Sequence, residues 1–225
     1  SSLCAVFGEV FAKKEDELVR ESYLIYEYIF FLMSFIAATC MMILMIPFMK
    51  VYTANITDAQ YIRPVTAILF TVIVLSRSIR TPSLTMIMAV GHYRETRRAA
   101  ILEAVINIVV SILLVKKCGI NGVLIGTVCS YMYRTWDIII YVGRKVIAGT
   151  LKTTISRVVR NIIIMGIVIG INYLIGTKVA NWLEWFLYAI RVGVISLIAF
   201  LSINTCFEKQ MAKKVFNIIG KVIKK

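Results

Sequence analysis

The sequence predicts an all-α polytopic membrane protein, and three observations lead to that fold class. Of the 225 residues, 60% are apolar or aromatic and only 17% are charged, whereas soluble domains are roughly 45–50% apolar on a closely similar count. The mean hydropathy is +0.83. Apolar stretches of about 20 residues, the length of a helix that crosses a bilayer core, recur along the chain. A water-soluble domain of this composition would lack polar surface.

The chain is also strongly basic, with 26 Lys and Arg against 12 Asp and Glu and a formal net charge of +14. A nucleic-acid-binding protein would share the charge but not the hydropathy, so that class is excluded. Most of the cations fall in alternate segments between the apolar stretches, as the positive-inside rule describes for cytoplasmic loops. With the N-terminus in the cytoplasm, six spans return both ends of the chain to the cytoplasmic side.

Six membrane helices are expected, and the first two are the clearest. The first is uncharged from Tyr28 to Phe48. The second is interrupted by Arg77 and Arg80 and contains Pro82. We interpret it as one bent helix, and two short helices around a re-entrant break are the alternative. The expected spans are 23–49, 64–90, 99–115, 119–142, 160–177 and 185–207.

The last four spans follow from their connections and from interfacial residues. The third and fourth are joined by only Lys116-Lys117-Cys118, so we expect an antiparallel hairpin. The fifth is an apolar run without a charge from Asn161 to Thr177. The sixth begins beside Trp182 and Trp185, which is typical of the aromatic belt at a membrane interface.

Two segments flank the six spans. Residues 1–22 are expected to be an N-terminal cytoplasmic loop that contains the end of a truncated helix, with more of the protein upstream. Residues 208–225 are expected to be a basic amphipathic cytoplasmic tail that lies on an anionic leaflet. Its apolar positions recur at helical spacing and are Met211, Val215, Ile218, Ile219, Val222 and Ile223.

Arg77 and Arg80 are the most informative residues of the predicted spans. An arginine at the centre of a bilayer costs about 2.5–3.5 kcal/mol on insertion scales, so each one needs a reason. These two lie near the middle of the second span, three residues apart, and their helix carries no acid. An aqueous cavity that receives an anionic ligand would account for them. Pairing with acids in a missing part of the protein is the alternative.

The remaining charges within the spans have simpler interpretations. Asp137 follows Arg134 by three residues, so we expect these two to pair on one helix face. Glu27 and Glu103 lie about one turn inside the cytoplasmic boundary, and we expect both to be hydrated.

Polar and small residues form stripes along the third, fourth and fifth spans. Small residues let membrane helices approach closely, and polar side chains form hydrogen bonds across the contact. Helix packing is therefore the first interpretation, with cavity lining second. The stripes are Glu103, Asn107 and Ser111; Gly122, Gly126 and Ser130; and Gly166 with Gly170.

No catalytic or metal-binding constellation is found in the sequence. The chain has 5 cysteines without a CxxC pair and a single histidine, His92, so a zinc site is not expected. A nucleophile elbow and a phosphate-binding glycine loop are also missing. The sequence therefore does not predict an enzyme or a cofactor, and coupling to H⁺ or Na⁺ stays open.

Between residues 80 and 137 the chain contains Arg80-Thr-Pro82, Gly91-His-Tyr93-Arg94-Glu-Thr96, Glu103-Ala-Val-Ile-Asn107, Ser111-Ile-Leu-Leu-Val and Gly119-Ile-Asn-Gly122-Val-Leu-Ile-Gly126-Thr127. With these residues the segment resembles the C-terminal half of bacterial polysaccharide-biosynthesis flippases, which transport the repeat units of O-antigen and capsule. These transporters belong to the multidrug/oligosaccharidyl-lipid/polysaccharide exporter superfamily.

The resemblance implies a fold, a cargo and a location. The six helices would form most of the second lobe of a two-lobed exporter, and the N-terminal lobe of the same protein would be the missing partner. The cargo would be an undecaprenyl-diphosphate-linked oligosaccharide, moved by alternating access across the bacterial cytoplasmic membrane. The candidate substrate-binding residues are Arg77, Arg80, Glu103, Asn107 and Arg134.

Other functions remain as alternatives. Within the same superfamily, these are a cation-coupled drug exporter, which a net basic midplane disfavours, and a peptidoglycan-precursor flippase. From another class, a membrane polysaccharide polymerase or ligase would also bind lipid diphosphates, but it would usually carry a larger external loop than this chain has. A structural assembly subunit is disfavoured by the cost of the midplane arginines.

Overall fold

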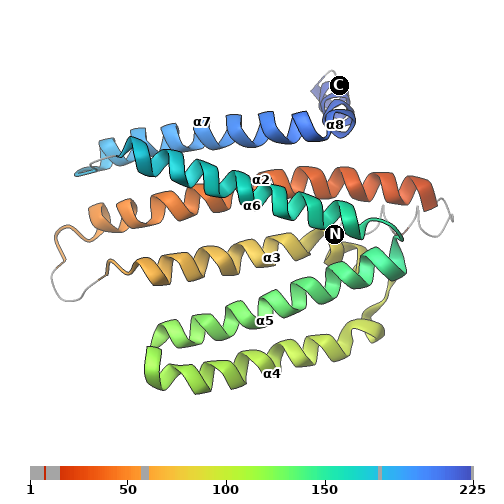
Figure 1. Ribbon diagram of the computed structural model, residues 1–225, viewed down its shortest axis with the longest axis horizontal. Helices are drawn as coiled ribbons and strands as arrows, with labels where there is room; N and C mark the ends of the chain where they lie inside the picture. The colour runs from red at the N-terminus through yellow and green to blue at the C-terminus, as the bar shows by residue number, and fades with distance from the viewer. Residues whose placement is uncertain (1–7, 9–15, 57–60, 177–178, 224–225) are drawn as a thin grey trace. The chain divides into compact units, whose positions relative to one another are not determined.

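A computed structural model of the chain describes residue 8 and residues 16–56, 61–176 and 179–223. Within these residues the secondary structure is helical throughout, with no strand (Figure 1). The elements in chain order are α2 (Asp16–Tyr52), α3 (Pro64–Val90), α4 (Tyr93–Cys118), α5 (Ile120–Tyr141), the π-helical turn η1 (Val142–Val146), α6 (Leu151–Ile175), α7 (Trp182–Phe207) and α8 (Lys209–Ile223).

Five of the described helices, α2, α3, α4, α6 and α7, are long and apolar enough to cross a membrane. The expected class, an all-helical multi-pass membrane protein, is confirmed at this level. The fourth expected span, α5, is not among the five, since Arg134 and Asp137 lower its hydropathy. Residues 16–22, expected to lie in a loop, belong to α2, whereas most of the N-terminal segment lies outside the described residues.

The helix α3 runs without interruption from Pro64 to Val90, and Pro82 lies inside it. A proline removes one backbone donor and usually kinks a helix without having to end it. The hydroxyl group of Thr81 donates to the carbonyl oxygen of Arg77 at 2.9 Å. The alternative of two short helices around a break therefore does not occur.

The chain divides into two compact units, and α2, α3 and α6 each continue from one unit into the other. The first unit comprises Ser1–Phe31 and Val72–Val158, and the second comprises Leu32–Thr71 and Val159–Lys225.

In the first unit, α4 and α5 form a tightly packed antiparallel hairpin (Figure 1). Gly119 joins them with a φ of 55°, a left-handed conformation that favours glycine, so the turn comes after Lys116-Lys117-Cys118 and not within it. A Cβ atom on Gly122 would lie 2.5 Å from the carbonyl oxygen of Leu114, and one on Gly126 would collide with Ser111. Glycine at these positions lets the two helices approach.

In the second unit, apolar side chains of α2, α6 and α7 form the core. Phe35 and Phe200 are both buried, with ring centroids 6.4 Å apart. Trp182 and Trp185 lie at the start of α7, where both rings contact Phe48. The three rings form one aromatic cluster, and its place at a membrane interface stays a prediction.

The second GxxxG motif differs from the first. Gly166 and Gly170 are exposed, and a Cβ atom on either would meet no described atom within 4 Å. Within the described chain these two positions make no close contact of this kind, so their role in helix packing stays a prediction. Small residues permit a close approach, but a helix must be present on that face for the approach to occur.

Candidate functional site

Arg80 of α3 has two partners from other helices of the first unit. Its Nη1 donates to Oε1 of Glu103 on α4 at 2.6 Å. The guanidinium carbon lies over the ring of Tyr131 on α5, 4.5 Å from the ring centroid. This geometry combines an ion pair with a cation–π contact. The expectation that Arg80 lacks a protein partner is wrong.

The depth of the two residues in their helices explains why they meet. Arg80 and Glu103 are each about ten residues from the turn that joins α3 to α4, which corresponds to about 15 Å along a helix. When a tight turn joins two helices, residues at equal distances from the turn lie at the same position along the two helix axes. Glu103, expected to be hydrated, is instead held between positively charged side chains.

Arg134 of α5 extends this ion pair into a network. Its Nη1 donates to Oδ2 of Asp137 at 2.8 Å and to the carbonyl oxygen of Thr96 at 3.1 Å. Its Nε lies 3.7 Å from Oε2 of Glu103. The predicted Arg134–Asp137 pair is therefore present, and Glu103 bridges the two arginines. With Arg80 included, two guanidinium groups face two carboxylates, so the network is formally neutral.

A hollow of about 350 Å³ opens beside this network between α4 and α5. Glu103 and Tyr131, the two partners of Arg80, both belong to its wall. The amide nitrogen of Asn107 donates to the hydroxyl oxygens of Thr127 and Ser130, each at 3.3 Å. The polar stripes thus join the helices and also line the hollow. The lining residues are Ala100, Glu103, Ala104, Asn107, Ile108, Ser130 and Tyr131.

Arg77 does not share this environment. Its side chain is exposed, and it has no hydrogen bond or ion pair within the described part of the chain. Residues three apart on a helix differ by about 60° around the axis, and here that rotation separates a paired arginine from an unpaired one. Of the predicted substrate-binding residues, the structure brings together Arg80, Glu103, Asn107 and Arg134, and it leaves Arg77 apart.

Sequence reasoning missed a second charged cluster of the first unit, built around Glu27 of α2. This carboxylate is 0% exposed, and its Oε2 accepts a hydrogen bond from Nη1 of Arg157 on α6 at 2.9 Å. Its Oε1 accepts from the hydroxyl groups of Tyr23 and Thr154, at 3.0 and 2.7 Å. The expectation that Glu27 is hydrated is wrong. Arg157, which precedes the expected span 160–177, is buried as well.

The chemistry of the Glu27 cluster favours a structural role. Each carboxylate oxygen has a donor, and Arg157 also donates to the carbonyl oxygen of Leu24 at 2.9 Å. The hydroxyl oxygen of Tyr23 lies 2.8 Å from that of Ser83, so α3 is joined to the cluster. Buried charges of this kind hold helices in one arrangement. An acid near the end of an apolar stretch was the one signal in the sequence, and nothing there pointed to Arg157.

The helices and their charged interior together define the class of this protein, a multi-pass helical membrane protein. Among the described residues, no group of three or more His, Cys, Asp or Glu side chains could hold a metal ion. No protein-family model, curated protein or solved structure matches this chain. Which kind of multi-pass membrane protein this is therefore depends on the chemistry of the site.

Proposed function

We propose that the chain is part of a flippase that moves undecaprenyl-diphosphate-linked oligosaccharide repeat units across the bacterial cytoplasmic membrane. The transport would proceed by alternating access and supply surface polysaccharide synthesis, and both ends of the chain would be cytoplasmic. The N-terminal lobe of the same protein would complete the pathway. The resemblance of residues 80–137 to such transporters supports the proposal from the sequence.

The observation that carries the proposal is the position of Arg80 beside the hollow. A guanidinium group matches the geometry of phosphate oxygens. The aromatic ring of Tyr131 offers a flat apolar surface. The amide of Asn107, which is bonded to the hydroxyl groups of Thr127 and Ser130, would exchange these partners for hydroxyl groups of a sugar. A ligand that combines a diphosphate with sugar rings therefore finds chemistry for both parts among residues within one hollow and its rim.

Glu103 has a specific role in this proposal. In the present structure its carboxylate forms an ion pair with Arg80 and lies near Arg134. An anionic ligand must displace this carboxylate to reach the guanidinium groups. The side-chain exposures of Arg80 and Glu103, 14% and 20%, leave the pair accessible for such an exchange. Glu103 would act as an internal counter-ion that neutralises the arginines whenever the ligand is absent.

The test uses the full-length protein in its bacterial host, with surface polysaccharide as the measurement. Arg80→Ala is expected to abolish surface polysaccharide, but it also leaves Glu103 unpaired in an apolar surrounding. The double substitution Arg80→Gln with Glu103→Gln removes both charges and should insert normally, yet it should also abolish polysaccharide. Arg77→Gln is the matched control and should retain it. Normal polysaccharide with a correctly inserted double variant would contradict the proposal.

One observation favours a cation-coupled drug exporter as a second candidate. The network is formally neutral and Glu103 lines the hollow, so the charges at this site do not disfavour a cationic cargo. The two candidates respond differently to Glu103→Gln. Export of a fluorescent organic cation would be lost in this variant, whereas binding of a lipid diphosphate would become tighter because Arg80 is released.

A further inference from the structure

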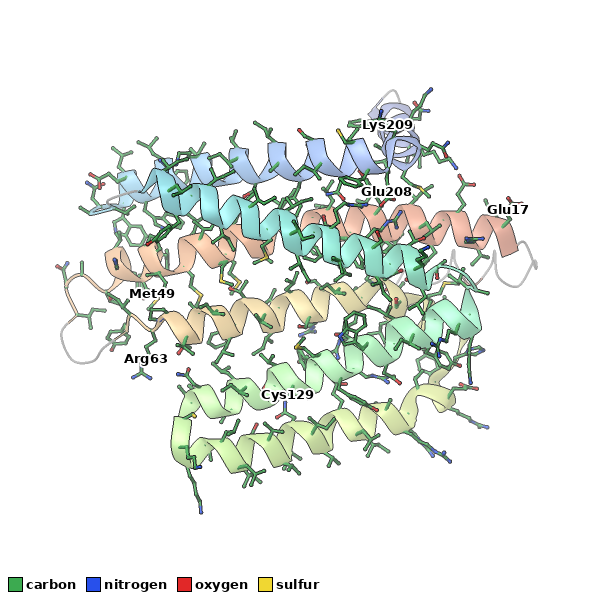
Figure 2. The ribbon with its side chains drawn as sticks, in the orientation of Figure 1. Glu17, Met49, Arg63, Cys129, Glu208 and Lys209 are labelled. Carbon is green, nitrogen blue, oxygen red and sulfur yellow. The ribbon has the colours of Figure 1, made fainter. Side chains whose placement is uncertain are left out.

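The C-terminal helix α8 changes direction sharply after α7. Only Glu208 separates the end of α7 at Phe207 from the start of α8 at Lys209, and its backbone is not helical, with φ −128° and ψ 56°. In Figure 1, α7 is seen from the side and α8 along its axis, so α8 runs crosswise to α7. Figure 2 labels Glu208 and Lys209 at this corner. If α7 crosses a membrane, as its length and hydropathy permit, a helix crosswise to it runs along the membrane plane.

A polar cluster of the second unit holds this corner in place. Nη2 of Arg160 on α6 donates to Oε1 of Glu208 at 2.5 Å, and its Nε donates to Oδ1 of Asn204 at 3.0 Å. The amide nitrogen of Asn204 donates in turn to Oδ1 of Asn161 at 2.9 Å. Both asparagines are buried. Side chains of α6 and α7 thus hold the corner through hydrogen bonds, and these bonds set the direction in which α8 leaves α7.

The described side chains of α8 separate into an apolar and a basic face. Ala212 is buried against the rest of the unit, and Met211 and Val215 beside it are half-buried. Phe216 and Ile218, on the two edges of the apolar face, are 60% and 45% exposed. The basic face carries Lys209, Lys213, Lys214 and Asn217, all exposed. The side chains of Ile219 and of residues 221–225 lie outside the described part.

We infer that α8 lies in the headgroup region of an anionic membrane leaflet, at the level where α7 ends. Phe216 and Ile218 would enter the acyl-chain region, and the lysines would face the phosphate groups of anionic lipids. Such placement is expected of a helix with a marked apolar face and a cationic polar face. The segment from Lys209 to Ile223 contains no acid, so its charge complements anionic lipid along its whole length. The inference does not depend on the transported cargo.

The first experiment measures the depth of single side chains in the bilayer. Spin labels are placed by cysteine substitution at Phe216, Ile218, Lys213 and Asn217 of the full chain, after its native cysteines are replaced, in nanodiscs that contain phosphatidylglycerol. Labels at 216 and 218 should be relaxed by oxygen from the lipid phase. Labels at 213 and 217 should be relaxed by a water-soluble nickel complex. Equal access of the nickel complex to all four sites would overturn the inference.

A protein partner would give another result. If a second copy of the chain covered α8, labels at 216 and 218 would be shielded from both oxygen and the nickel complex, and this outcome would also overturn the inference.

The second experiment tests the role of lipid charge. The label at Ile218 should lie deeper in nanodiscs with phosphatidylglycerol than in nanodiscs of phosphatidylcholine alone. Lys213→Gln with Lys214→Gln should abolish this difference. Lys116→Gln with Lys117→Gln is the matched control, because it removes the same charge at exposed positions of another helix and should leave the difference intact. The same depth in both lipids for the unsubstituted protein would contradict attraction by anionic headgroups.

Discussion

The two acid–arginine pairs of the first unit differ in how much water reaches them. Glu27 and Arg157 have side-chain exposures of 0% and 1%, whereas those of Arg80 and Glu103 are 14% and 20%. Separating a fully buried ion pair costs much free energy, because each ion would lose its partner without gaining water. In a partly exposed pair, a ligand can replace one ion as the partner of the other. This difference in burial fits a structural role for the first pair and the ligand exchange that we propose for the second.

The buried pair leads to a prediction about stability. Arg157→Leu leaves the carboxylate of Glu27 buried without its cation, a change that typically costs about 3–5 kcal/mol. We expect a lower thermal unfolding temperature of the purified chain in detergent, measured by loss of the monodisperse fraction after heating. The pair Glu27→Gln with Arg157→Leu removes both charges and should recover most of the loss. A single variant as stable as the unsubstituted protein would show that the pair does not hold the helices.

At the scale of helices, the α4–α5 hairpin shows how glycines at a regular spacing contact a neighbouring helix. Gly122 and Gly126 lie one turn apart and face the backbone of α4, while Asn107 forms hydrogen bonds across the same contact. Gly166 and Gly170 have the same spacing but face no described atom. The spacing therefore identifies a helix face that allows close packing, and the neighbouring helix decides whether packing takes place.

The hairpin provides a matched pair of substitutions. Gly126→Ala places a methyl group against Ser111 and the carbonyl oxygen of Asn107, so the helices must move apart, at a typical cost of about 1–3 kcal/mol. Gly166→Ala introduces the same methyl group into open space. We expect thermal stability to fall only in the first variant, measured on both proteins in the same detergent. An equal fall in both would show that the contact at Gly126 is not the cause.

At the scale of the whole molecule, the number of membrane crossings determines which side each loop faces. Five described helices meet the length and hydropathy of a span, and α5 does not. The six-span arrangement, in which both ends are cytoplasmic, requires α5 to cross as well. The Arg134 side chain that lowers the hydropathy of α5 is paired with Asp137, which reduces the cost of placing it in the membrane.

Labelling of single cysteines distinguishes the two arrangements. Lys117 and Lys145 are exposed at opposite ends of α5, so cysteines at these positions should react from opposite sides of the membrane if α5 crosses it. Asn55 and Arg97 provide the reference, and they should be labelled from the outside and the inside, respectively. A membrane-impermeant thiol reagent applied to intact cells gives the readout. Labelling of positions 117 and 145 from the same side would exclude the six-span arrangement.

The sequence by itself determined the class of this protein. Hydropathy and span length depend on composition along the chain, and a membrane helix satisfies its own backbone hydrogen bonds within one segment. For that reason the helices, the antiparallel hairpin of α4 and α5 and the Arg134–Asp137 pair could be predicted from neighbouring residues, whereas the position of the turn at Gly119 was not. Only the tertiary structure decided which distant charges meet. Arg80 finds Glu103 on another helix, and Arg157 pairs with Glu27 across 130 positions of the sequence. Such pairings depend on how helices rotate and pack, which local pattern does not specify.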